Sequence, residues 1–209
     1  MLNFYSKYLE DAVNEIAKLP GVGRRTALRL ALFVAKNEEK EVLQLSEALL
    51  KLKSHLTVCQ HCFNLSDDCI CHICNNPKRD KSMVCVVQDI RDVIAIENTN
   101  QYTGVYHVLG GVISPMDGVG PNQLKLAELF QRIENEDIKE LILALPATVE
   151  GDTTNFYIHK NVKVKVPVIT LLSRGVGIGE ELEYTDEVTL GRSLLARTEF
   201  ERAYNRMQA

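Results

Sequence analysis

The sequence predicts an α/β protein in several parts: a helical N-terminal region, a compact metal site, and a parallel α/β domain that ends in a short tail. Apolar residues recur at helical spacing through residue 56, two Cys-x-x-Cys pairs follow, and from residue 83 β-branched runs alternate with helical patterns. Such alternation is typical of a parallel sheet with helices on its faces. We expect four segments, residues 1–56, 57–76, 82–178 and 179–209.

The composition is that of a soluble globular protein. Of the 209 residues, 45% are apolar and 25% are charged, and the formal net charge is −4. This charge argues against a generally basic nucleic-acid coat, but it does not exclude a local basic patch, because phosphates respond to the local field. No cationic start leads into an apolar run, and no apolar stretch reaches about 18 residues. We therefore expect a cytoplasmic protein without a signal peptide or a membrane span.

The first 56 residues are predicted to form helices. Pro20 and Gly21 end the first helix, and residues 26–34 suit a second. A third apolar stripe follows, and it is narrow enough to be buried either within this region or against a second subunit. The first helix carries Leu9, Val13, Ile16 and Leu19, and the third stripe consists of Val42, Leu45, Leu49, Leu52 and Leu56.

The turn between the first two helices is the candidate nucleic-acid site. Gly21 and Gly23 flank one apolar residue, which predicts a tight hairpin with free backbone N–H groups at the start of the next helix. Arg24, Arg25 and Arg29 follow, and the last two lie four residues apart on one helical face. This pattern resembles the helix-hairpin-helix motif, which grips a DNA backbone without reading bases. The alternative is an ordinary helical corner with solvated arginines.

Two cysteine pairs predict the metal site. Cys59 and Cys62 form one pair, Cys71 and Cys74 form the other, and eight residues separate them. Four thiolates at this spacing suit one tetrahedral zinc ion, and a closed site of this kind is structural because no position is left for a substrate. Cys69 does not fit the paired spacing and is expected to be a spare thiol. The alternative is a pair of disulfides, which a cytoplasmic location disfavours.

After a short polar linker, 77-PKRDKS-82, strands and helices alternate. Cys85 lies in the first apolar run and is expected to be a small buried hydrophobe. In such sheets, ligands bind at the carboxyl ends of the strands, so we expect functional residues there. The expected strands cover residues 83–87, 105–109, 141–145 and 162–172, and the expected helices cover 90–97, 122–134 and 153–159. Residues 182–200 are expected to form a strand or turn and a closing helix.

Several motifs occur in one order along the chain: 19-LPGVG-23, 59-CQHC-62, 71-CHIC-74, 114-SPMDGVGP-121, 148-TVEGD-152 and 182-LEYTDEVTLGRSL-194. Together with the order of the parts, these motifs resemble the RecR family of bacterial recombination mediator proteins. The resemblance runs from about residue 9 to residue 195, which is nearly the whole chain.

The resemblance implies a fold and a role. It implies a helix-hairpin-helix region over residues 1–56, a C4-type zinc finger over 57–76 and a Toprim domain over 82–178. It also implies a homotetrameric ring that encircles DNA, with RecO and RecF as partners and with no membrane attachment. The implied role is in DNA repair and recombination: loading recombinase onto single-stranded gaps in damaged DNA, independently of RecBC, in the cytoplasm at the nucleoid.

The resemblance implies a role for a residue only where this chain matches the family's motif at that position. The four paired cysteines fall on the family's zinc ligands, which implies one structural Zn²⁺ per chain. Arg25 and Arg29 fall on two basic positions that the family uses for DNA, beside the hairpin residues Gly21, Gly23 and Arg24. Asp92, Glu150 and Asp152 fall on the Toprim face that resembles the contact surface for RecO.

Two stretches depart from the family pattern. The first Toprim strand usually ends in glutamate, but this chain has Gln88, which can be neither a metal-binding carboxylate nor a general base. The segment 160-KNVKVKVPVIT-170 looks unlike the usual passage from a helix to a strand.

Three kinds of function follow from these observations. Toprim enzymes hold Mg²⁺ with a glutamate and an Asp-x-Asp pair, but this chain has Gln88 at the first position and no acid in 143-LALPAT-148 at the second. These missing acids favour a DNA clamp that is not an enzyme. The alternative is a Toprim-type Mg²⁺-dependent enzyme, such as a nuclease, primase or topoisomerase, with Glu150 and Asp152 as a remaining acidic pair on a loop. A third hypothesis is a protein–protein adaptor that does not touch DNA.

Overall fold

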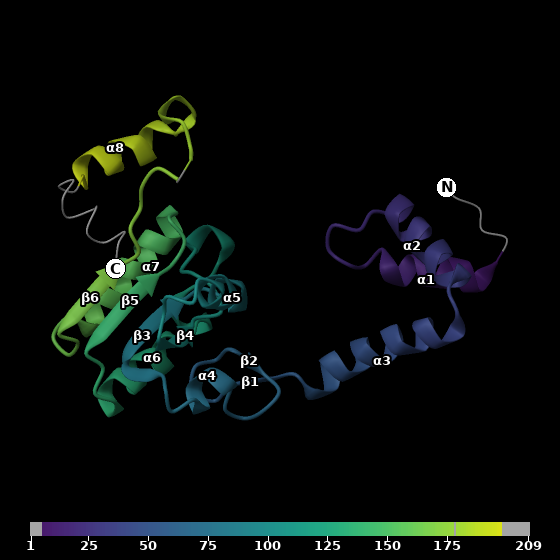
Figure 1. Ribbon diagram of the computed structural model, residues 1–209, viewed down its shortest axis with the longest axis horizontal. Coiled ribbons are helices and arrows are strands. Elements are labelled where there is room, and N and C mark those ends of the chain that lie inside the picture. The colour runs from purple at the N-terminus through teal and green to yellow at the C-terminus, as the bar shows by residue number, and fades with distance from the viewer. Residues whose placement is uncertain (1–5, 178, 198–209) are drawn as a thin grey trace. The chain divides into compact units, whose positions relative to one another are not determined.

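The computed structural model describes residues 6–177 and 179–197, and the chain divides into two compact units after Leu56 (Figure 1). Unit 1 comprises Met1–Leu56 and unit 2 comprises Thr57–Ala209. Among the described residues, none of the helices combines the length and the apolar character that crossing a membrane requires.

Unit 1 is helical, as the sequence predicts. It contains α1 (Lys7–Ile16), α2 (Arg24–Lys36) and α3 (Glu39–His55). Ser6 caps α1, where its hydroxyl accepts a hydrogen bond from the Leu9 N–H at 3.4 Å. A small core joins α1 to α2, and its alanines allow the two helices to approach closely. It consists of Val13, Ala27 and Ala31, with Leu9, Ile16, Ala17, Val22 and Leu28 packed around them.

The third helix of unit 1 buries none of its residues within the unit. Its exposed leucines include Leu45, Leu49 and Leu52, which are 52%, 59% and 57% exposed. Of the two alternatives for the third apolar stripe, burial inside the helical region is therefore not observed.

Unit 2 is built on a four-stranded parallel sheet in the order β4-β3-β5-β6. This confirms the predicted parallel α/β fold. The strands are β3 (Asp80–Val87), β4 (Gly104–Val108), β5 (Glu140–Ala144) and β6 (Val168–Leu171). The helices α5 (Ile90–Asn98), α6 (Leu126–Asn135) and α7 (Val149–Val162) connect them.

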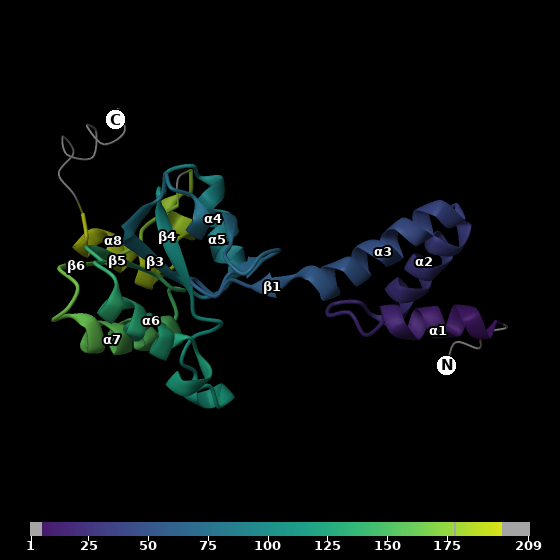
Figure 2. The same cartoon turned by 90° about the horizontal axis from the view of Figure 1, so that it is seen from below.

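The sheet buries both of its faces, and successive residues of β3 alternate between two cores. Val84 and Val86 pack with leucines and isoleucines of α6 and α7. Cys85 and Val87 point the other way and pack with α5 and the cysteine region. Figure 2 shows α6 and α7 on one side of the sheet and α4 and α5 on the other. Cys85 is 2% exposed, which confirms it as a buried core residue.

The cysteine region is a compact knuckle, which we define as residues 57–76. Its elements are β1 (Thr57–Val58), β2 (Leu65–Ser66) and α4 (His72–Asn75). The Val108 N–H donates to the Cys62 carbonyl at 2.8 Å, so the knuckle covers the edge of β4. Phe63 of the knuckle lies edge-on against His107 of β4, with ring centroids 5.3 Å apart. The knuckle is therefore part of the second core of unit 2.

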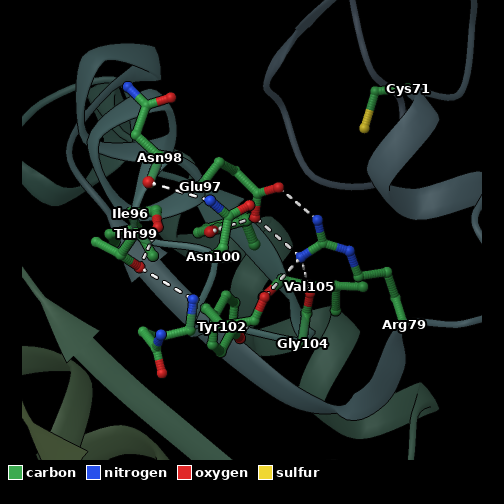
Figure 3. A network of polar contacts seen from close by, with 12 residues as sticks. Cys71, Arg79, Ile96, Glu97, Asn98, Thr99, Asn100, Tyr102, Gly104 and Val105 are labelled. Carbon is green, nitrogen blue, oxygen red and sulfur yellow. Dashed lines mark hydrogen bonds and ion pairs between the residues drawn. The ribbon is translucent and has the colours of Figure 1, made fainter.

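The predicted polar linker at 77–82 is wrong in its second half, because β3 begins at Asp80 and Arg79 is held in place. Arg79 forms an ion pair with Glu97 and donates hydrogen bonds to the carbonyls of Tyr102 and Gly104 at 3.1 and 3.3 Å. Figure 3 shows its guanidinium directed at these groups. Tyr106 donates to the same Glu97 carboxylate at 2.7 Å. This network ties the exit of the knuckle to α5 and β4.

Two helices start at residues other than those that the sequence predicts. Helix α6 starts at Leu126 instead of residue 122, because a 3₁₀ turn (Pro121–Gln123) precedes it. Helix α7 starts at Val149, so Glu150 and Asp152 lie in its first turn and not on a loop. The Thr148 hydroxyl caps this turn by accepting from the Gly151 N–H at 3.2 Å.

The structure also corrects the interpretation of residues 160–170, which looked unlike the usual passage from a helix to a strand. Helix α7 continues to Val162, and β6 begins only at Val168, so the passage from helix to strand is present. In the C-terminal part, a 3₁₀ turn (Leu182–Tyr184) precedes α8 (Glu187–Leu195). The last residues of the predicted tail, 198–209, lie outside the described residues.

Candidate metal centre and nucleic-acid hairpin

The four paired cysteines converge at one point. Their sulfur atoms all lie within 4.8 Å of one another, and Cys62 Sγ and Cys71 Sγ are 3.6 Å apart. A zinc ion with Zn–S bonds of about 2.3 Å holds the sulfurs of a tetrahedral site about 3.8 Å apart. All four side chains are buried, between 0% and 6% exposed. The cluster therefore fits a closed tetrahedral metal site without an open position.

Local backbone geometry brings the sulfurs together. The Cys59 N–H donates to the Asn64 carbonyl at 2.8 Å and the Phe63 N–H to the Cys59 carbonyl at 3.0 Å, which closes a tight turn around the first pair. Phe63 has a φ of 64°, the left-handed conformation that this turn requires. In the second pair, Cys71 caps α4 and its sulfur accepts from the Cys74 N–H at 3.5 Å.

The four sulfurs interact strongly with one another. The contact between Cys62 and Cys71 lowers the pKa of Cys71 and raises the pKa of Cys62, because one sulfur donates its proton to the other. The Cys71 N–H also donates to the Cys59 sulfur at 3.3 Å, as expected for a thiolate ligand. Buried thiolates repel one another, so ionising all four needs a bound metal.

Cys69 is exposed and does not belong to the four-sulfur cluster, which confirms it as a spare thiol. The neighbouring His61 is not a ligand in this arrangement either. Its Nε2 lies 2.9 Å from Glu136 Oε1, and Arg132 Nε donates to the other oxygen of Glu136 at 3.0 Å. The loop of the first cysteine pair is thereby tied to the end of α6.

The predicted hairpin is present between α1 and α2. Gly21 has a φ of +77°, a conformation that L side chains rarely adopt, and Val22 packs into the small core of unit 1. Gly23 is the N-cap of α2 and has no side chain to satisfy the first N–H groups of that helix. The turn therefore presents backbone donors at a positive helix terminus.

Basic side chains lie next to this turn. Arg25 and Arg29 are exposed on α2. Arg24 reaches back to α1, where its Nη2 donates to Asn14 Oδ1 at 3.4 Å. The hairpin thus combines backbone donors with a basic helical face, which is the combination that contacts phosphates.

The acids of the predicted partner face follow two neighbouring strands. Asp92 lies in the first turn of α5, and its Oδ2 accepts from the N–H groups of Gln88 and Asp89 at 3.0 Å each. Glu150 and Asp152 follow β5 in the first turn of α7. Asp92 therefore caps its own helix through Oδ2, and Gln88 supplies no carboxylate where β3 ends.

Two arginines that the sequence did not single out contact this face. Arg174 donates to both oxygens of Asp152, and Arg192 approaches one of them. The hydrogen bonds from Arg174 lower the pKa of Asp152, and the charge of Arg192 adds to the effect. The sequence holds one signal for each: Arg174 follows the last β-branched run, at the carboxyl end of a strand, and Arg192 lies in the motif 182-LEYTDEVTLGRSL-194.

Three family models match the chain in the order of its parts. The model described as RecR, helix-hairpin-helix, matches residues 9–53. The Toprim domain model matches residues 82–170, and the model described as RecR, C-terminal, matches residues 175–198.

Curated relatives match along almost the entire chain. Recombination protein RecR of Cytophaga hutchinsonii is 56% identical over 201 residues, which cover 96% of this chain and 98% of that protein. The protein of the same name from Flavobacterium psychrophilum is 51% identical over 203 residues, covering 97% and 98%. That from Porphyromonas gingivalis (strain W83) is 52% identical over 197 residues, covering 94% and 95%. The hairpin, the four-cysteine knuckle and the Toprim sheet thus belong to one known architecture, and the chain is a member of the RecR family of recombination proteins.

Proposed function

We propose that this protein is a recombination mediator in DNA repair, a clamp that holds DNA by its backbone and performs no chemistry on it. The proposal is supported by membership of the RecR family and by the hairpin of unit 1. We further propose that the clamp is a homotetrameric ring in the cytoplasm, at the nucleoid. Acting with RecO and RecF, it loads recombinase at single-stranded gaps, independently of RecBC.

The observation that carries the proposal is the geometry around Gly23. Its φ of −74° suits any residue, and a Cβ at this position would meet nothing within 4 Å. Neither backbone strain nor packing inside unit 1 therefore explains a glycine here. A glycine does allow a phosphate to approach the N–H groups at the start of α2 closely. Arg25 and Arg29 supply the charge that such a phosphate needs.

We assign one structural Zn²⁺ per chain to Cys59, Cys62, Cys71 and Cys74. Sulfur ligands, tetrahedral spacing and the lack of an open position all suit zinc in a structural role. When bound, zinc contributes charge neutralisation and folding free energy at this site, and the knuckle's residues position the four sulfurs.

The acids of the Toprim face suit protein contacts better than catalysis. Gln88 occupies the end of β3, and Asp152 is neutralised by Arg174. We assign Asp92, Glu150 and Asp152 to the surface that meets RecO.

DNA binding at different salt concentrations tests the clamp. We expect the Arg25→Gln/Arg29→Gln variant to bind single-stranded DNA of any sequence more weakly. Its log–log salt dependence is expected to be shallower by about 0.7 for each phosphate that the variant no longer neutralises. Gly23→Ala should weaken binding, with only a small fall in the Tm because alanine is a poorer N-cap residue than glycine. Lys40→Gln/Lys53→Gln removes the same charge elsewhere on unit 1 and serves as the control.

An adaptor that does not touch DNA predicts equal binding by both double variants. An Mg²⁺-dependent enzyme predicts cleavage, ligation or synthesis on nicked, single-stranded or supercoiled DNA that Glu150→Ala abolishes. Either result would overturn the clamp.

A further inference from the structure

The C-terminal segment of unit 2 returns to the start of α7 and contacts it through charged groups. Arg174, which follows β6, donates from Nη1 and Nη2 to the two oxygens of Asp152 at 3.0 and 2.6 Å. Arg192 of α8 places its Nη2 3.7 Å from Asp152 Oδ2. A single carboxylate in the first turn of α7 thus binds two later stretches of the chain.

Apolar packing contributes little to the position of α8. The helix has no buried residue, and Val188, Leu194 and Leu195 are 64%, 61% and 85% exposed. A cleft of about 740 Å³ separates α8 from the start of α7, and residues of both helices line it. The pair between Arg192 and Asp152 is therefore a charged contact that joins α8 to the start of α7 across this cleft. Figure 1 shows α8 beyond α7 in this unit.

Helix α8 is also weak on its own. It has nine residues, whereas isolated helices shorter than about 12–15 residues are marginal in water. Gly191 lies inside it, and a Cβ at this position would meet nothing within 4 Å, so packing does not require the glycine. Breaking its ion pair with Asp152 would therefore raise the population of released and unwound α8.

We propose that α8 is a latch that closes over the carboxylate of Asp152. In the closed state Arg192 takes one of the two cationic positions at this carboxylate, and Arg174 takes the other. When α8 is released, the position of Arg192 is free for a guanidinium or ammonium group of another protein. The proposal rests on the assignment of Asp152 to the partner face. It adds that the partner brings a basic side chain and competes with the protein's own C-terminal helix.

Hydrogen exchange on the full-length protein tests the latch without any partner. Because ion pairs at this exposure are weak, we expect Arg192→Gln to speed amide exchange in α8 by about two- to five-fold. Gly191→Ala strengthens the helix itself and should slow this exchange. Lys160→Gln, an equal charge change at the exposed far end of α7, is the control. Exchange in Arg192→Gln no faster than in this control would overturn the latch.

Titration with RecO tests the competition. We expect Arg192→Gln to bind RecO about two- to five-fold more tightly, matching its faster exchange, and Asp152→Asn to bind more weakly. If Asp152→Asn binds like the wild type, the assigned partner face is wrong, and hydrogen exchange still decides whether the latch exists. If Asp152→Asn binds more weakly but Arg192→Gln does not bind more tightly, the competition is wrong.

Discussion

Arg79 and Glu97 show how much a single pair of residues contributes to this fold. Their side chains are 17% and 26% exposed and form an ion pair, and the Glu97 carboxylate also accepts a hydrogen bond from Tyr106. Burial alone would raise the pKa of Glu97, but the hydrogen bonds from Arg79 and Tyr106 outweigh it and lower this pKa. The folded state therefore favours the ionised carboxylate, and the pair stabilises unit 2 at neutral pH.

Glu97→Gln keeps the shape of the side chain and removes its charge. We expect it to lower the free energy of unfolding by about 1–3 kcal/mol at pH 7, because the Arg79 guanidinium stays partly buried without its carboxylate. The pKa of Glu97 is lower in the folded than in the unfolded protein. The stabilisation is thus complete above the unfolded value of about 4.3 and is lost as the pH falls through the folded value.

Urea unfolding at pH 7, 5 and 4 measures this effect. The control is Glu134→Gln, which breaks the half-exposed pair with Lys165 and should cost less than about 1 kcal/mol. Any loss of metal at low pH affects both variants alike, so it cancels in the comparison. A Glu97→Gln protein as stable as the control at pH 7 would show that this pair contributes no more than the half-exposed pair of Glu134 and Lys165.

At the scale of elements, the order of strands and helices could be predicted from the sequence, but not all of their ends. Helix α7 starts at Val149 and not at the expected residue 153, because Gly151 and Asp152 are poor helix formers and hide the first turn from propensity. Its helical start depends on the Thr148 cap and on the close approach of Gly151 to the strand end, where a Cβ would lie 2.0 Å from the Pro146 carbonyl oxygen. Such contacts are tertiary, so the hydrophobic periodicity of the sequence does not predict them.

The same distinction between local signals and tertiary contacts applies to the candidate sites. Cysteine spacing is a local signal, so it predicted all four members of the cluster and excluded Cys69. No local pattern indicated that the knuckle would share a core with Val87 and Tyr106, or that Arg174 and Arg192 would reach Asp152. These residues are distant in sequence, and only the folded sheet brings them together.

Metal removal should therefore destabilise the whole of unit 2 and spare unit 1. The four cysteines lie in the same core as β3, β4 and α5. A structural zinc site contributes several kcal/mol or more, and each 1 kcal/mol shifts the Tm of a unit of this size by about 2–4 °C. We expect chelation to lower the Tm of unit 2 by about 10 °C or more.

Calorimetry with metal analysis measures this loss, and hydrogen exchange reports whether α1 and α2 stay protected. Cys59→Ser/Cys74→Ser should reproduce the effect of chelation. Cys69→Ser is the matched control and should keep both the metal and the Tm. If the Cys59/Cys74 variant stayed folded with its zinc, the ligand assignment would be wrong.

At the scale of the whole molecule, α3 is a helix whose apolar stripe has no partner within the described residues of its own unit. Leu45, Leu49 and Leu52 are each more than half exposed on one side of this helix. Contiguous exposed apolar surface on a folded protein marks an interaction site. A second copy of the chain suits it, because the ring assembly proposed above needs an interface between subunits and a narrow helical stripe can bury itself against its own copy.

If α3 joins two copies of the chain, acidic residues in its apolar stripe should disrupt the assembly. Burying a leucine contributes about 1.5–3 kcal/mol, so Leu45→Asp/Leu49→Asp should weaken self-association by at least about 100-fold. Native mass spectrometry should then show particles of lower mass than the wild type, while circular dichroism still shows the helices. Lys40→Gln/Ser54→Asp makes the same change in charge at exposed positions away from the stripe and should leave the mass unchanged. Equal masses for the leucine variant and the wild type would mean that α3 is not an interface and that the ring is held together elsewhere.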